Sequence, residues 1–324
     1  MKESLALLAF AGAAGTLGAS ALRRATWLRS SPRLGVLAWQ VLSVSVLAAL
    51  LLAGASAVVP SDVISTNLAD VLQACVMALQ AQYSTPGGAL VHATAATATV
   101  VLAVRTGYLL TTGLRGAKQA SEEHLVQVRL AARADTRLGA LVLEHPAAVA
   151  YCLPGGAGTV VLTSAAVLTL TDVELAAVLA HERAHLRGRH HLITAAAVAL
   201  QRTLPVLPVF RWAVSEQARL LEMIADDAAA RRGHRVDVAR ALVRLAEGSA
   251  SHVPHVALGA ADIAALDRVQ RLVAPARTLP WLARGAVGVV IAVTALLPVT
   301  IAGAPAYAAT RLSYCPVPTA QPNV

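Results

Sequence analysis

Long uncharged stretches alternate with short basic segments along this chain, and four of these stretches are long enough to cross a membrane. A helix rises about 1.5 Å per residue, so about 20 apolar residues span a hydrocarbon core of about 30 Å. This pattern predicts transmembrane helices over residues 4–22, 34–59, 88–110 and 283–304. A signal peptide is the alternative for the first stretch, because Lys2 precedes it and small residues follow it.

The charged residues lie mainly between the third and fourth apolar stretches. Residues 113–282 carry 34 of the 45 charged residues. We therefore predict a membrane domain over residues 1–112, a polar domain over 113–282, the fourth transmembrane helix over 283–304 and a short outer tail over 305–324.

One further apolar run, residues 192–210, lies inside the polar domain. It is interrupted by Arg202, Pro205 and Pro208, which favours a partly membrane-associated helix over a full span. A full span here would divide the polar domain between the two sides of the membrane.

The distribution of arginines predicts the orientation in the cell membrane. Residues 60–87 contain no Lys or Arg, whereas the segment between the first two stretches contains Arg23, Arg24, Arg29 and Arg33. By the positive-inside rule that segment is cytoplasmic, so we expect the N-terminus and the C-terminal tail outside and the polar domain in the cytoplasm. Cys75 and Cys315 then lie on the outer side, where a disulfide between them is one open alternative.

The amino-acid composition excludes several classes of protein. Of the 324 residues, 56% are hydrophobic and 14% are charged, and the mean hydropathy is +0.62, which excludes a disordered chain and an ordinary soluble enzyme. Only 3% are aromatic and many arginines flank apolar runs, so we expect no direct binding of nucleic acid. Apart from Arg105, the predicted spans are uniformly apolar, which also disfavours a transporter or channel.

The polar domain contains an HExxH motif formed by His181, Glu182 and His185. Upstream, Thr171 and Glu174 form a capping-box signature that predicts the start of a helix. On that helix the two histidines lie one turn apart on one face, where they can bind a single Zn²⁺. Glu182 is the candidate general base.

The third metal ligand is predicted in a second helix. Glu222 is the candidate ligand, and Asp226, one turn later, can accept the free N–H of a zinc-bound histidine. We expect Ser215 to cap this helix and residues 231–233 to end it. Asp227 points about 100° away and is expected at the surface or in a cap.

A second ligand set fits the same stretch of sequence. Residues 181–191 also match HExxHxxGxxH, in which Gly188 would end the helix and His191 would be the third ligand, as in a metzincin. Met223 lies inside the predicted helix and not in a turn, which favours Glu222 over His191 as third ligand.

A β-hairpin is predicted before the motif. Residues 147–153 and 159–164 are β-prone, and a turn-forming segment, Pro-Gly-Gly-Ala-Gly, separates them. An exposed edge strand near the metal could hold an extended peptide by main-chain hydrogen bonds, although the hairpin could also serve only to complete the core.

Together these features resemble the BlaR/MecR-type integral-membrane metallopeptidases and, more distantly, the HtpX-type membrane proteases. The resemblance rests on the early spans and on the motifs at residues 151–155, 159–164, 172–185 and 222–226. It implies an α+β gluzincin-like zinc-peptidase domain in a mainly α-helical membrane protein of about four transmembrane helices. In that family His181, His185 and Glu222 would hold zinc, Glu182 would act as base, and a cytoplasmic transcriptional repressor is often the substrate.

The chain departs from the antibiotic sensors of that family. Only about 20 residues follow the fourth span, so we expect no outer sensor domain. The only lysines are Lys2 and Lys118, and neither has a serine three residues before it. Without an SxxK motif, we expect no β-lactam acylation.

The sequence therefore predicts a membrane-embedded zinc endopeptidase with one Zn²⁺ per chain. Its expected partners are the lipid bilayer and a cytoplasmic or juxtamembrane polypeptide, cleaved in regulated proteolysis or signalling. Arg231 and His234 are candidate oxyanion stabilisers, with helix-end charges as the other interpretation. The alternative function is a non-catalytic or self-cleaving membrane signalling scaffold with a zinc site.

Overall fold

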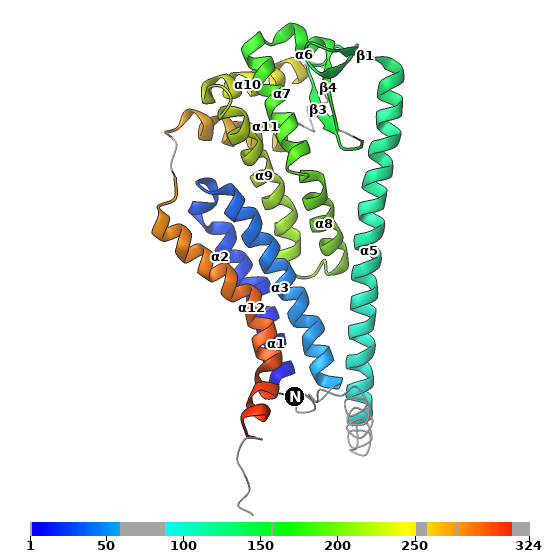
Figure 1. Cartoon of the computed structure of the whole chain (residues 1–324), viewed down its shortest axis with the longest axis vertical. Helices are drawn as coiled ribbons and strands as arrows, with labels where there is room; N and C mark the ends of the chain where they lie inside the picture. The colour runs from blue at the N-terminus through cyan, green and yellow to red at the C-terminus, as the bar shows by residue number, and fades with distance from the viewer. Residues whose placement is uncertain (1, 59–87, 157, 251–257, 276–277, 313–324) are drawn as a thin grey trace, which may run out of the picture.

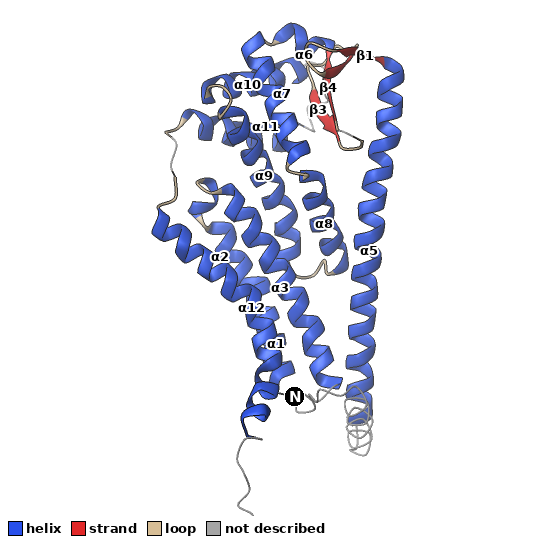
Figure 2. Ribbon diagram, in the orientation of Figure 1, coloured by secondary structure: helices blue, strands red, loops and turns tan. Residues whose placement is uncertain are grey.

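A bundle of long helices carries a smaller helical unit with one sheet at one end (Figures 1 and 2). The computed structural model describes residues 2–58, 88–156, 158–250, 258–275 and 278–312. Cys75, Cys315 and the predicted loop over residues 60–87 lie outside these residues.

Four helical segments in the described part of the chain are long and apolar enough to cross a membrane. They are Lys2–Arg24, Pro32–Val58, Gly88–Ala131 and Trp281–Ala304. Each apolar stretch predicted from the sequence falls on one of them. The first is α1 (Lys2–Ala13) joined to α2 (Ala19–Arg24) by a π-helical turn, and the others belong to α3 (Pro32–Val58), α5 (Gly88–Ala131) and α12 (Trp281–Leu312).

Helix α5 extends well past the predicted end of the third span at residue 110. It runs for 44 residues, so the predicted domain boundary at residues 112 and 113 falls inside a continuous helix. Residues 114–131 are rich in Leu, Arg, Lys, Glu, Gln and Ala, which favour helix. Leu125 and Val128 then pack against Leu153 and Val161 of the sheet, which holds this end of α5 in place. Similarly, α12 continues to Leu312, into the predicted outer tail.

The sheet has four short strands in the order β1-β2-β4-β3. They are β1 (Ala132–Asp135), β2 (Ala140–Leu143), β3 (Ala150–Leu153) and β4 (Thr159–Thr163). Strands β3 and β4 pair antiparallel, which confirms the predicted hairpin, and β2 pairs parallel with β4. The sequence analysis missed β1 and β2, because four-residue strands give too short a pattern to recognise. Strand β3 is an edge of the sheet.

Six helices lie between the sheet and α12 in the described part of the chain: α6 (Ser164–Thr169), α7 (Asp172–Arg187), α8 (His190–Thr203), α9 (Pro208–Ala230), α10 (Arg235–Ala250) and α11 (Leu258–Val273). The predicted capping box at the start of α7 is confirmed. The side chain of Thr171 accepts from the backbone N–H of Glu174, and the Glu174 carboxylate accepts from the backbone N–H of Thr171. This start positions the HExxH motif in the last two turns of α7.

Residues 192–210 form two helices and not the single one predicted. Helix α8 ends at Thr203, and Pro208 begins α9 after a short turn. With 14 residues, α8 is about 21 Å long, which is too short to cross a hydrocarbon core. Arg105 of α5 donates to the carbonyl of Arg202, one of the carbonyls that the end of α8 leaves without a helical partner.

The start of α9 was predicted wrongly at Ser215. The helix begins two turns earlier, because proline suits the first turn of a helix, and the hydroxyl of Ser215 donates to the carbonyl of Trp212 inside the helix. The added turns bury Val209 and Phe210 in a core shared with α1 and α3, where Leu7 and Trp39 are also fully buried. Helix α9 therefore packs against the long apolar helices α1 and α3 at its start and against α7 further along.

Candidate metal centre

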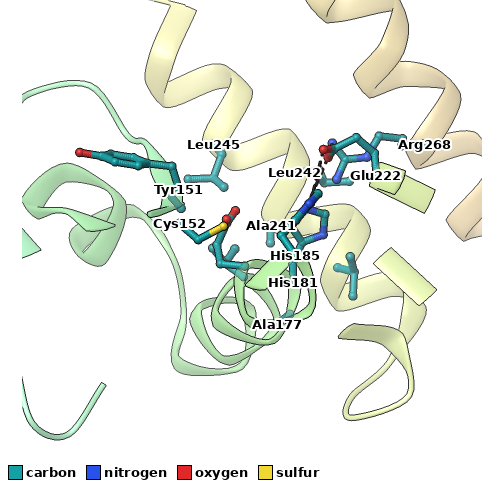
Figure 3. Close-up of a pocket in the computed structure, with 14 residues that line it drawn as sticks. Tyr151, Cys152, Ala177, His181, His185, Glu222, Ala241, Leu242, Leu245 and Arg268 are labelled. Carbon is teal, nitrogen blue, oxygen red and sulfur yellow. Dashed lines mark hydrogen bonds and ion pairs between the residues drawn. The ribbon is translucent and has the colours of Figure 1, made fainter. Parts of the chain in front are cut away.

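Helices α7 and α9 bring the two motif histidines together with Glu222. Nε2 of His181 lies 3.2 Å from Nε2 of His185 and 3.4 Å from Oε2 of Glu222, and Nε2 of His185 lies 3.4 Å from Oε1 of Glu222. Figure 3 shows the three side chains facing one another at the wall of a cavity. They form the group of His, Cys, Asp and Glu side chains that could hold a metal ion within the described residues.

These separations fit a tetrahedral zinc site. With metal–ligand distances of about 2.1 Å, neighbouring ligand atoms of a tetrahedron lie about 3.4 Å apart. The observed 3.2, 3.4 and 3.4 Å match that spacing. Two imidazoles and one carboxylate are also a donor set typical of catalytic zinc, with the fourth position left for water or substrate.

Asp226 supports the first histidine. Its Oδ1 lies 3.0 Å from Nδ1 of His181, so the ring can donate its N–H there and present Nε2 to a metal. Its side chain is 1% exposed, and burial raises its pKa, but hydrogen bonds from Arg268 and His181 outweigh burial and lower the pKa to about 2. The structure therefore places Asp226 where the sequence predicted it, next to a candidate ligand.

His190 supports the second histidine. Its Nδ1 lies 2.9 Å from Nδ1 of His185, so one of the two rings can donate an N–H hydrogen bond to the other. Gly188 lies directly beneath the His190 ring, and a Cβ there would lie 2.4 Å from Nε2 of His190. The glycine in this stretch is thus required for the close approach of His190 and not for a turn, since its φ is −77°.

Arg268 is a site residue that the sequence analysis missed. From α11 it donates to both carboxylate oxygens of Asp226, at 2.7 and 2.8 Å, and its Nη1 lies 2.9 Å from Oε2 of Glu222. One guanidinium thus contacts both Glu222, the candidate third ligand, and Asp226, which lies behind His181. Figure 3 shows Arg268 beside Glu222. The sequence contains only a weak signal for this contact. Arg268 and Arg271 lie in a stretch with a periodic apolar pattern, but each lies 42 or more residues after the carboxylate that it contacts.

The charges at the site suit metal binding. Burial raises the pKa of Glu222, but the hydrogen bond from His181 and the charge of Arg268 outweigh it and lower the pKa to about 2. Burial lowers the pKa of His185 to about 4. Burial also lowers the pKa of His181, but hydrogen bonds to Asp226 and Glu222 outweigh it and raise the pKa to about 9. A metal would therefore displace one proton, from His181.

Glu182 lines the same cavity, which has a volume of about 450 Å³. Burial raises the pKa of its carboxyl group, which moves it towards the range that suits a general base near neutral pH. Cys152 of β3 lies on the facing wall (Figure 3), and burial, reinforced by the charge of Glu182, raises the pKa of its thiol to about 12. A neutral thiol is a poor metal ligand.

Strand β3 forms one wall of this cavity. Ala150, Tyr151 and Cys152 all line it, opposite the motif histidines. Because β3 is an edge of the sheet, its free backbone groups can pair with an added extended strand. The arrangement can therefore hold a peptide alongside the metal cluster.

The other candidate residues lie elsewhere. His191 is half-buried and is not in the metal-binding group, because Arg189 takes a left-handed φ of 49° and α8 restarts at His190. Neither Arg231 nor His234 lines the cavity. Asp227 is not simply at the surface or in a cap: it accepts two hydrogen bonds of 2.8 Å from Arg271 of α11.

Residues 117–276, just under half of the chain, match the model of peptidase family M48. Neither the curated proteins nor the solved structures gave a significant match. The family match does not test the narrower resemblance to BlaR/MecR-type or HtpX-type proteins. The matched segment contains the whole metal-binding cluster and its cavity, so this part of the chain is similar to the zinc-dependent metallopeptidases of family M48.

Proposed function

We propose that the protein is a membrane-embedded zinc endopeptidase. The observation that carries this proposal is the spacing of the two Nε2 atoms and the Glu222 carboxylate, which fits zinc, beside the half-buried Glu182 and the edge strand β3. The match to family M48 supports it independently. A bound Zn²⁺ would polarise the scissile carbonyl and lower the pKa of the attacking water.

The side chains would divide the chemistry as follows. The edge of β3 would bind the substrate backbone as an added strand beside the metal cluster. The Glu182 carboxylate would take a proton from the attacking water and then pass it to the leaving amine. Asp226, His190 and Arg268 would keep the ligand atoms aimed at one point.

Replacement of the proposed base tests catalysis directly. We expect Glu182→Gln to keep one zinc per chain and to lower cleavage of fluorescently labelled casein by about 100- to 10,000-fold, because the amide cannot accept the proton. Glu144→Gln, at an exposed position outside the cavity, is the control and should match the unchanged protein. Cleavage by Glu182→Gln at the unchanged rate would contradict the proposal and favour a zinc-binding signalling scaffold.

The ligand set has its own test. Zinc content measured by mass spectrometry on purified protein should be about one per chain, lost with Glu222→Ala and kept with His191→Ala. The reason is that Glu222 lies 3.4 Å from both candidate histidine ligands, whereas His191 lies outside the group. Loss of zinc with His191→Ala alone would instead support the metzincin arrangement.

We propose that the four apolar helices cross the cell membrane, with the N-terminus and C-terminal tail outside and the catalytic unit in the cytoplasm. The basic segment between the first two helices supports this orientation. In intact cells, an external protease should remove a tag at the N-terminus but not one inserted at the exposed Gly233. The opposite pattern would reverse the topology.

A cytoplasmic polypeptide is the substrate class that follows from this placement. The resemblance to BlaR/MecR-type proteins favours regulated cleavage, such as that of a transcriptional repressor. The Glu182→Gln protein, crosslinked in cells and purified, should retain the substrate uncut. Recovery of many unrelated uncut proteins would indicate general turnover instead.

A further inference from the structure

A second cavity lies where the membrane bundle joins the peptidase unit. It has a volume of about 620 Å³ and is lined by residues from the start of α3, the end of α7, the start of α8 and the end of α9. It is separate from the cavity at the metal cluster, since no residue lines both. Its position at the first turn of an apolar helix corresponds to the headgroup layer of a membrane crossed by α3.

Four arginines surround this cavity, and no carboxylate does. Arg33 comes from α3, Arg187 from α7, and Arg231 and Arg232 from the segment after α9. All four are exposed, and none of their guanidinium groups forms a hydrogen bond or ion pair with another described residue. By contrast, Arg268 and Arg271 nearby are both paired with carboxylates. The cavity therefore concentrates positive charge that the described part of the chain does not neutralise.

The remaining lining is largely apolar. Val36, Ile193, Leu221 and Ile224 lie among the arginines. All four also belong to or pack on the core that joins α9 to α1 and α3. An anion with an attached hydrocarbon portion suits such a surface, because the guanidinium groups can bind its oxygens while the apolar side chains contact its chains.

We propose that this cavity binds the phosphate headgroup of an anionic phospholipid. A guanidinium group can donate two parallel hydrogen bonds to the oxygens of one phosphate. Basic pockets at the cytoplasmic ends of membrane helices bind anionic lipid headgroups. The proposal rests on the membrane placement of α3 and is independent of the peptidase activity. His190 forms part of the wall and also contacts His185, so a bound lipid lies one side chain away from a candidate metal ligand.

Lipid retention measured by native mass spectrometry tests this site. The full chain, purified in detergent, is exposed to phosphatidylglycerol or phosphatidylcholine. We expect one phosphatidylglycerol to be retained in preference to phosphatidylcholine. Each arginine should contribute about fivefold to phosphatidylglycerol affinity. Arg231→Gln should therefore weaken retention about fivefold, and the double variant Arg33→Gln/Arg231→Gln about 25-fold. Arg24→Gln, at another exposed juxtamembrane arginine outside this cavity, is the matched control and should change nothing.

Three results would overturn the proposal: equal retention of both lipids, an equal loss with the Arg24→Gln control, or binding of inorganic phosphate as tight as that of phosphatidylglycerol. The last result would assign the cavity to a soluble phosphate compound. Zinc content in the same samples shows that the double variant remains folded, and it should stay at the value of the unchanged protein.

Discussion

At the residue scale, the two histidines of the motif are held by different kinds of partner. His181 faces a carboxylate that is itself fixed by an arginine, whereas His185 faces a second imidazole. Such partners set which ring nitrogen carries the proton and how the ring is oriented. The contact of His185 depends on the absence of a side chain at Gly188, because a Cβ there would overlap the His190 ring.

Gly188→Ala tests that dependence. Since the φ of Gly188 is −77°, alanine fits the backbone, and the expected effect comes only from displacement of the His190 ring. We expect zinc affinity to fall about 10- to 100-fold in a competition assay with a chelator. Gly116→Ala, in a helix with open space around it, should leave the affinity unchanged. An unchanged affinity for Gly188→Ala would show that His190 does not orient His185.

At the element scale, the first turn of α7 fixes where the motif lies along its helix. The capping box between Thr171 and Glu174 satisfies backbone N–H groups that the helix start would leave unpaired, and Arg244 lies 3.2 Å from the buried Glu174 carboxylate. Burial raises the pKa of Glu174, but the hydrogen bonds from Thr171 and the charge of Arg244 outweigh it and lower the pKa below its ordinary value of 4.5.

This lowered pKa predicts a pH-dependent stability. Because the folded protein holds the proton of Glu174 less tightly than the unfolded chain does, the carboxylate stabilises the folded state above pH 4.5, and this stabilisation is lost as the pH falls through the lowered pKa. Glu174→Gln should therefore lower the Tm at pH 7 and have a smaller effect at an acid pH below 4.5. Glu123→Gln, exposed on α5, should have no effect at either pH. A deficit of equal size at low pH would contradict this account.

Arg268 and Arg271 of α11 are both paired with carboxylates of α9, and the two arginines have different surroundings. Arg268→Ala would leave Asp226, which is 1% exposed, without its cation, so we expect a loss of about 3 kcal/mol in stability and a lower zinc affinity. Arg271→Ala is the matched control, because Asp227 is 24% exposed and does not line the metal cavity. It should cost less and leave zinc affinity unchanged, as measured by thermal unfolding and chelator competition. Equal effects on zinc would remove Arg268 from the site.

At the scale of the whole molecule, the bundle of long apolar helices and the unit that contains the metal cluster share one core. Phe210 of α9 is 1% exposed and packs in the same cluster as Leu7 of α1 and Trp39 of α3. The predicted division at residue 112 therefore does not separate two independent cores, and we expect the two parts to unfold together.

Phe210→Ala tests this coupling. Removing a buried aromatic side chain costs about 3–5 kcal/mol, so the variant should lower both the temperature of tryptophan fluorescence change and that of zinc release by the same amount. Leu168→Ala, at a position 86% exposed, should alter neither. Separate transitions, with zinc release unaffected by Phe210→Ala, would show that the peptidase unit is stable by itself.

The sequence by itself determined the features that depend on neighbours close along the chain. The apolar length of each membrane helix, the capping box of α7, the hairpin of β3 and β4, and the one-turn spacing of His181 and His185 are all local patterns. Glu222 and Asp226 could be nominated because they also share one face of one helix.

Only the tertiary structure decided what depends on distant contacts. Arg268 contacts Asp226, which lies 42 residues earlier in the sequence. The left-handed backbone at Arg189 places His190, and not His191, in contact with His185. The extension of α9 to Pro208 and the length of α5 follow from packing against other helices and the sheet. Such contacts leave no periodic trace in the sequence, because they are fixed by the packing of elements and not by the spacing of residues within one.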